Sequence, residues 1–349
     1  PVFASSVDLT SAHATILRCG VTSSSGGGVS CVASKSDQVL TLHENEQDGA
    51  TCQSNVYLFR QKSSTPVLYA CVTKGVYFGK GTTIIDSTAV KSGGAVSANL
   101  CSVDMSNMTI TNGTSLVGDG GAVMVSLDST LRVDSKSLFR TNQAKQGSGG
   151  AISCHECSMM SFGQNTIFDS NIAHKSGGAV QLRLPKNPIV SSNSLFIGNK
   201  AAKGNGGAVD SYHGTWKSIG DRFELNIAQH GSGGAFSSFG SHLHFDVSTA
   251  CRKNQALEGG GGCILWEPEA LNIEDEKWKT FAPVISSMQL INNNKAAFGV
   301  NLATPGASLH IFKDSGMTKM TTNNENLLAP KFPKVDIIDK YGSVVQGDL

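Results

Sequence analysis

Few of the side chains that could act as acids, bases or nucleophiles stand together in this 349-residue sequence. The best local group of titratable residues is Asp210, His213 and Asp221, an ordinary composition for a polar loop. Enzymes that cleave polysaccharides need two or three carboxylates, or a carboxylate and a basic side chain, converging on one face. No GxSxG nucleophile elbow, phosphate-binding glycine loop or dinucleotide-binding fingerprint is present. We therefore expect no catalytic residues, and keep a carbohydrate-active enzyme as the alternative.

The nine cysteines offer the next candidate chemistry. One Cys-x-x-Cys pair is suited to zinc, but no second pair supplies the remaining ligands of a tetrahedral site. Two other pairs share a separation of twelve residues, as if one loop were closed twice in equivalent places. We expect no metal and no cofactor, and an odd count leaves at least one thiol unpaired within the chain. The disulfide candidates are Cys19 with Cys31, Cys154 with Cys157, and Cys251 with Cys263.

Disulfides indicate an oxidising compartment, so we expect a secreted or cell-surface protein. Asn107 and Asn112 each begin an Asn-x-Thr sequon and are the candidate glycosylation sites of a glycoprotein. No charged-then-apolar leader follows Pro1, so any signal peptide is expected to have been removed or to lie outside this sequence. The formal net charge of +1 and a charged fraction of 16% give no electrostatic footprint for nucleic acid. No apolar run approaches the ~18 residues of a membrane span.

A repeat of about 28 residues organises most of the chain. A Gly-Gly pair followed by a small and then an apolar residue recurs with spacings of 27, 29, 28, 29, 27 and 28 residues. Such a period is typical of a solenoid, whose units bury their apolar faces only against one another. The seven pairs begin at Gly93, Gly120, Gly149, Gly177, Gly206, Gly233 and Gly261.

A Phe-x-x-Asn motif keeps step with the glycine pairs, and an Ala follows two residues after each Asn. Short alternating segments between the motifs have the period of strands, and no segment shows a sustained helical period. The complete motifs are Phe139 with Asn142, Phe168 with Asn171, Phe196 with Asn199, and Phe223 with Asn226, and a degenerate copy pairs Cys251 with Asn254.

These patterns predict an all-β fold, a right-handed single-stranded parallel β-helix of about ten coils, each holding two or three short strands. Equivalent residues of successive coils would lie about 4.8 Å apart and form ladders. We expect the phenylalanines to stack inside the tube and the asparagines to hydrogen-bond amide to amide along the axis. The glycine pair would supply a sharp bend with positive φ where a side chain would clash.

The combination of GGA[IV] and Phe-x-x-Asn resembles the polymorphic membrane protein repeat of chlamydial autotransporter passenger domains, and similar repeats in surface proteins of protists and algae. The resemblance covers roughly residues 80–303. It implies a right-handed parallel β-helix exposed on a cell surface.

The ends of the chain are less regular. Residues 1–79 are expected to form irregular coils or a cap with clustered cysteines, because the 66 residues between Gly27 and Gly93 fit two coils plus about ten residues. Regular coils would occupy 80–303, a linker or C-terminal cap 304–334, and the start of an immunoglobulin-like domain 335–349. An acidic insertion that includes Trp266 and Glu267 is expected after Cys263.

The turn after each motif Ala often carries a lysine, and Lys145, Lys175 and Lys203 would stack into a ridge for anionic glycans. Apart from that ridge, every repeated residue serves the fold, and Asp128, Asp169, Asp210 and Asp246 take different places within their coils. We expect a non-catalytic extracellular structural or adhesive module of a larger cell-surface or appendage protein. Its partners would be other extracellular proteins, neighbouring copies or glycans, with no nucleic acid and no membrane span. A glycan-binding module without turnover is a further alternative.

Overall fold

The computed structural model describes residues 81–268 and 290–305, together with Pro283 and Asp339. Outside these ranges it describes ten strands: β1 (Phe3–Ser5), β2 (Leu9–Ser11), β3 (Thr15–Leu17), β4 (Gly20–Val21), β5 (Val29–Val32), β6 (Tyr57–Phe59), β7 (Val67–Tyr69), β8 (Val76–Phe78), β39 (Ser308–Ile311) and β40 (Val335–Ile338). In this part of the chain there are strands, turns and bends but no helix, so none of it could cross a membrane as a helix.

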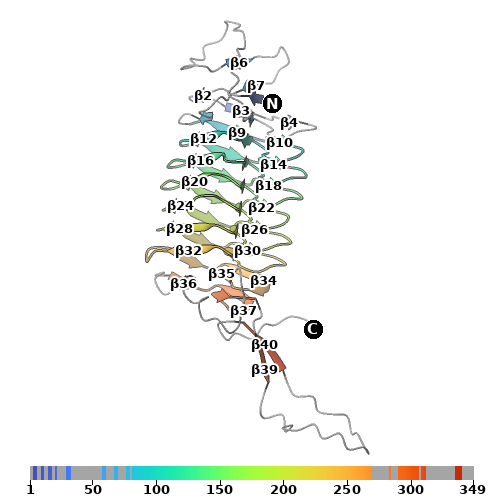
Figure 1. Ribbon diagram of the computed structural model, residues 1–349, viewed down its shortest axis with the longest axis vertical. Helices are drawn as coiled ribbons and strands as arrows, with labels where there is room; N and C mark the ends of the chain where they lie inside the picture. The colour runs from blue at the N-terminus through green and yellow to red at the C-terminus, as the bar shows by residue number, and fades with distance from the viewer. Residues whose placement is uncertain are drawn as a thin grey trace, which may run out of the picture.

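Each coil runs through four strands, and the same strand of successive coils pairs in parallel to form one of four sheets (Figure 1). One coil comprises β15 (Val123–Ser126), β16 (Thr130–Val133), β17 (Leu138–Arg140) and β18 (Gln143–Ala144). The next coil begins with β19 (Ile152–His155), where Ile152 pairs with Val123. The expectation of two or three strands per coil was wrong, because strands of two and three residues are too short to show a period in the sequence.

We name the four sheets A to D in the order in which a coil passes through them: sheet A contains β1, β5, β15 and β19, sheet B contains β16, sheet C contains β17 and sheet D contains β18. The remaining strands follow the same order. Sheet A continues through β11 (Val96–Asn99), β23 (Val180–Arg183), β27 (Val209–Tyr212), β31 (Phe236–Phe239), β35 (Ile264–Glu267) and β38 (Leu302–Ala303). Sheet B continues through β12 (Ser102–Met105), β20 (Met159–Phe162), β24 (Ile189–Ser192), β28 (Thr215–Ile219) and β32 (His242–Phe245). Sheet C continues through β9 (Thr83–Ile85), β13 (Thr109–Thr111), β21 (Ile167–Asp169), β25 (Leu195–Ile197), β29 (Arg222–Glu224), β33 (Ala250–Arg252) and β36 (Leu290–Asn292). Sheet D continues through β10 (Thr88–Ala89), β14 (Thr114–Ser115), β22 (Ile172–Ala173), β26 (Lys200–Ala201), β30 (Ile227–Ala228), β34 (Gln255–Gly260) and β37 (Lys295–Phe298).

This arrangement confirms the all-β parallel solenoid with about 28 residues per turn. About seven turns are regular, and sheet A, the longest, contains ten strands because irregular coils flank the regular ones. The right-handed sense stays a prediction that follows from the handedness of parallel crossovers.

The N-terminal irregularity differs from the expected two coils plus about ten residues between Gly27 and Gly93. Strand β5 pairs directly with β11, and β2, β3 and β4 pair directly with β8, β9 and β10. The segment between β5 and β8 is therefore an insertion within a single coil, and it carries the antiparallel pair β6–β7. A spacing of 66 residues fits either interpretation, because an insertion lengthens the interval as one further coil would.

Two findings concern the C-terminal end of the solenoid. Trp266 and Glu267 belong to strand β35 of sheet A rather than to the acidic insertion, and Trp266 is buried. Strand β40 pairs with β39 in antiparallel fashion, across the predicted boundary between residues 334 and 335. The main-chain N–H of Thr304 also donates to Asp339, which links this hairpin to the last coil.

Candidate functional site

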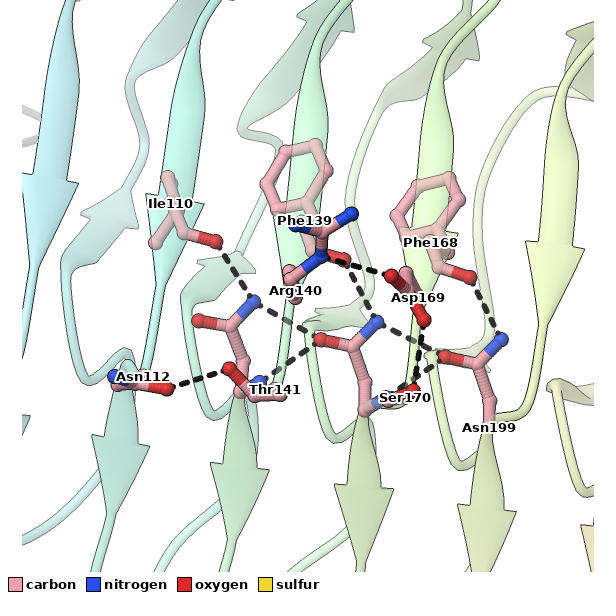
Figure 2. Close-up of polar contacts among 11 residues, drawn as sticks. Ile110, Asn112, Phe139, Arg140, Thr141, Phe168, Asp169, Ser170 and Asn199 are labelled. Atoms are coloured by element: carbon pink, nitrogen blue, oxygen red, sulfur yellow. Dashed lines mark hydrogen bonds and ion pairs between the residues drawn. The ribbon is translucent and has the colours of Figure 1, made fainter.

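A column of asparagine side chains runs along the inside of the corner between sheets C and D (Figure 2). Each side-chain nitrogen donates to the side-chain oxygen of the next Asn, at 2.9, 2.9, 3.0, 2.9 and 3.2 Å. The predicted amide ladder is thus present, and it extends one coil beyond the residues predicted from the motif. Its members are Asn142, Asn171, Asn199, Asn226, Asn254 and Asn294.

The ladder also satisfies main-chain groups, which the sequence motif does not reveal. The Asn171 oxygen accepts a second hydrogen bond from the main-chain N–H of Asn142, at 3.0 Å. The Asn171 nitrogen also donates to the carbonyl of Phe139 in the preceding coil, at 3.0 Å. The same pattern recurs at Asn199. Because all amide groups in this buried column are used in hydrogen bonding, its function is structural.

The four motif phenylalanines stack beside the ladder, as predicted. Ring centroids of Phe139 and Phe168 are 5.1 Å apart, those of Phe168 and Phe196 4.7 Å, and those of Phe196 and Phe223 4.8 Å, with interplanar angles of 10°, 7° and 10°. All four rings are buried. Their stacking direction is the solenoid axis, since each is the central residue of a paired strand in sheet C.

The two glycines of each pair have different tasks. The first, such as Gly177, has a φ of 66°, a conformation that other residues adopt only with strain. A Cβ on the second, Gly178, would lie 2.1 Å from the carbonyl oxygen of Gly207 in the next coil. Both the positive φ and the clash expected from the sequence are therefore present.

A second ladder, which the sequence analysis missed, involves the residue just before each glycine pair. In successive coils the main-chain N–H at this position donates to the equivalent side chain of the preceding coil, over 2.7–3.4 Å. The sequence feature that could have indicated this ladder is the small polar residue just before most of the glycine pairs. We call this the turn ladder, and it consists of Ser92, Asp119, Ser148, Ser176, Asn205, Ser232 and the N–H of Gly260.

The lysines of the predicted glycan ridge lie on this same turn between sheets D and A. Lys145, Lys175 and Lys203 are all exposed. Register places Ala144, Ala173 and Ala201 side by side, so Lys145 is one residue out of step with the other two. None of the three has a carboxylate partner among the described residues. The hydrogen bonds of the turn ladder fix the main chain of the turns that carry these lysines.

Some cations on the other faces are paired with carboxylates. On sheet C, Arg140 donates to Asp169 at 2.8 Å, and Arg252 contacts Glu224 at 2.7 Å. Near the corner between sheets A and B, Lys186 pairs with Asp128.

The group of titratable residues that stands together in the sequence does not converge on one face of the structure. Asp210 lies on the outer side of β27 in sheet A, whereas Asp221 is buried in the turn before β29, and His213 packs edge-on against Tyr212. Oδ1 of Asp221 accepts from the main-chain N–H of Ser194 at 2.8 Å. Burial raises the pKa of Asp221 to about 7, although hydrogen bonds such as that from Ser218 oppose the shift.

The outer face of sheet A carries a stacked aromatic pair and two carboxyl groups with raised pKa values. Tyr212, 42% exposed, stacks on Phe239 with ring centroids 5.0 Å apart and an interplanar angle of 7°. Burial raises the pKa of Asp210 to about 7, against the hydrogen bond from Ser237 and the charge of Arg183. Burial also raises the pKa of Glu267 on the same sheet.

Two of the expected disulfides are present, Cys154–Cys157 and Cys251–Cys263. The expected partner Cys19 lies outside the described residues. Cys101 is disulfide-bonded as well, a pairing for which no prediction was made.

Both sequon asparagines are exposed at turns with positive φ. The Asn112 nitrogen donates to Asp86 at 3.0 Å, while its oxygen accepts from Thr141. Both side chains can thus be reached from solvent, and glycosylation stays a prediction.

Within the described ranges no three His, Cys, Asp or Glu side chains are grouped so that they could hold a metal ion. Fold and ladders together define a β-solenoid protein. Comparison with protein-family models, with curated proteins and with solved structures gives no significant match. The resemblance to polymorphic membrane protein repeats accordingly stays a prediction.

Proposed function

We propose that this chain is a non-catalytic structural scaffold, a stiff extracellular rod that spaces or presents adhesive parts of a cell-surface assembly. The observation that supports it best is the pair of side-chain ladders, which run through consecutive coils parallel to the axis. Ladders of this kind tie each coil to the next beyond the main-chain hydrogen bonds, and so resist bending.

The distribution of chemically competent groups agrees with this proposal. Ladder asparagines and phenylalanines are buried and cannot meet a ligand. Asp210 and Asp221 have raised pKa values, yet Asp210 lies on strand β27 and Asp221 in the turn before β29, so they do not share a site. The disulfides Cys154–Cys157 and Cys251–Cys263 favour the extracellular location, because such bonds persist in oxidising surroundings.

Small-angle scattering on the full chain tests the rod. Ten strands of sheet A at about 4.8 Å predict an axial length of about 45 Å for the solenoid, with an elongated distance distribution that 1 M salt leaves unchanged. A compact distribution would contradict the rod.

A carbohydrate-active enzyme is the second candidate, favoured by the carboxyls of Asp210 and Glu267 on one face with the exposed Tyr212 ring. Both carboxyls have raised pKa values, as a general acid requires. Incubation with a panel of neutral and anionic polysaccharides distinguishes the two functions. Release of reducing ends or unsaturated products by the wild type, lost in Asp210→Ser, would replace the scaffold proposal with the enzyme.

A further inference from the structure

We propose that the turn between sheets D and A, with the adjoining strand of sheet D, binds an extended anionic polysaccharide parallel to the solenoid axis. The surface consists of five lysines, which we call the lysine strip: Lys91, Lys145, Lys175, Lys200 and Lys203. This site adds a ligand to the rod but does not depend on the scaffold proposal.

The lysines of the strip have no carboxylate partner within the described part of the chain. Four of its lysines are exposed, Lys200 is half-buried on β26, and none makes an ion pair with a described carboxylate. Arg140, Arg252 and Lys186, by contrast, are each held by a carboxylate. Exposed lysines without such a partner also occur on other faces, but the strip places five of them along one turn and its adjoining strand. A protein of net charge +1 thereby presents a local positive stripe.

The backbone beneath the strip is held in place by hydrogen bonds. The main-chain N–H of Lys145 donates to Ser115, that of Lys175 to Gly147 and that of Lys203 to His174. The turn ladder fixes the same turns a few residues later, where the N–H of Asn205 donates to the Ser176 hydroxyl at 3.1 Å. A prearranged backbone lowers the entropy lost on binding.

The spacing suits a linear polymer with repeated charges. Lys145, Lys175 and Lys203 come from three successive coils, about 4.8 Å apart along the axis. That rise is comparable with the length of one sugar residue in an extended chain. In the coils after Lys203, the same turn carries His230 and Glu258, which contact each other at 2.7 Å. An anionic ligand extended past Lys203 would therefore meet the carboxylate of Glu258.

The chemistry favours carboxylated or sulfated sugars over nucleic acid. Lysine ammonium groups bind single anionic groups as point charges, whereas nucleic-acid surfaces combine such charges with arginines and stacking aromatic rings. The five residues of the strip include neither arginines nor aromatic rings.

Binding of the full chain to immobilised heparin, polygalacturonate, dextran and duplex DNA tests the proposal. The strip variant Lys145→Gln/Lys175→Gln/Lys203→Gln is compared with Lys136→Gln/Lys217→Gln/Lys253→Gln, three exposed lysines on other faces that also lack a described carboxylate partner. Both variants remove the same charge, and equal thermal unfolding temperatures would show that both fold.

The strip variant is expected to lose about tenfold in affinity for heparin, polygalacturonate or both, while the control loses less than about twofold. Polygalacturonate carries carboxylates alone, whereas heparin carries sulfates as well, so binding to heparin but not to polygalacturonate would show that sulfate is required. The proposal would be overturned by equal losses in both variants or by a wild type that binds neither anionic polymer. It would also be overturned if the wild type bound duplex DNA as tightly as the anionic polysaccharides. None of these outcomes affects the scattering test of the rod.

Discussion

The side-chain oxygen of Asn199 accepts two hydrogen bonds from Asn171, one from its side-chain nitrogen at 2.9 Å and one from its main-chain N–H at 3.0 Å. Asn199 in turn donates to Asn226 and to the carbonyl of Phe168. One buried side chain therefore joins three consecutive coils.

Replacement of this residue is expected to be severely destabilising. Asn199→Ala leaves buried donors on Asn171 and a buried carbonyl on Phe168 without partners, and each orphaned group costs about 1–3 kcal/mol. We expect a loss of about 3–5 kcal/mol in the free energy of unfolding, measured by chemical denaturation. The control Gln143→Ala, on the outer side of β18, should change stability by less than about 1 kcal/mol. Equal effects of the two substitutions would contradict the ladder's importance.

Glycines in crowded and in open surroundings should respond differently to an added methyl group. Gly178→Ala places Cβ 2.1 Å from a main-chain oxygen of the next coil, so we expect a loss of more than about 3 kcal/mol or failure to fold. Gly198 has a φ of 64° but no atom within 3.4 Å of the added Cβ, so Gly198→Ala should cost about 1–2 kcal/mol. Thermal unfolding of both variants measures the difference, and a milder effect at Gly178 would show that the coils can move apart.

The phenylalanine column should tolerate isoleucine better than alanine. Ile84 and Ile110 occupy the same column in earlier coils, so the backbone already accommodates that side chain there. Phe196→Ala is expected to cost about 3–5 kcal/mol through the cavity it leaves. Phe196→Ile should cost about 1–2 kcal/mol, and its stability by denaturant titration checks this order. An Ile variant as unstable as the Ala variant would mean that ring stacking, rather than filled volume, governs the column.

Stability is expected to fall as pH rises from about 4 to 7 because of Asp221. Its pKa is about 7 in the folded chain and about 3.9 when unfolded, so the folded state holds the proton more tightly. The contribution is complete below the unfolded value and lost on passing the folded value, at most on the order of 4 kcal/mol. Asp210 has the same direction of shift and adds to the slope.

Asp221→Ser should flatten this dependence, because Ser137 fills the equivalent place in an earlier coil and accepts a main-chain N–H there. The exposed Asp134→Ser serves as the control and should leave the slope unchanged. Unfolding temperatures from pH 4 to 8 provide the measurement. A wild-type curve whose stability rises between pH 5 and 7 would contradict the assignment.

Regular spacing carries the fold prediction a long way. Phe139 and Phe168 lie one repeat apart in sequence and are adjacent in space, because a solenoid converts a period into a contact. The same logic predicts the ladder from Asn142 to Asn254, since identical residues at one place in every coil must meet.

Features without a period were beyond such reasoning. The insertion between β5 and β8 appears in the sequence only as a longer interval between glycine pairs. The raised pKa of Asp221 comes from its burial beside Ser194 and Ser218, which no sequence pattern indicates. The turn ladder escaped notice because Ser92, Asp119 and Asn205 differ in type while sharing one role, acceptance of a neighbour's N–H. Lys145 is out of register because it follows its motif alanine directly, whereas one residue separates Lys175 and Lys203 from theirs.

The ladders and the parallel sheets all place their hydrogen bonds along one direction, the long axis of the solenoid (Figure 1). Tension drawn along that axis would consequently detach an end coil from its neighbour before it disturbed the interior. Each coil that peels away would release about 95 Å of extended chain in exchange for about 5 Å of rod. A surface appendage with this construction would lengthen stepwise under load and dissipate a pull as a series of small ruptures.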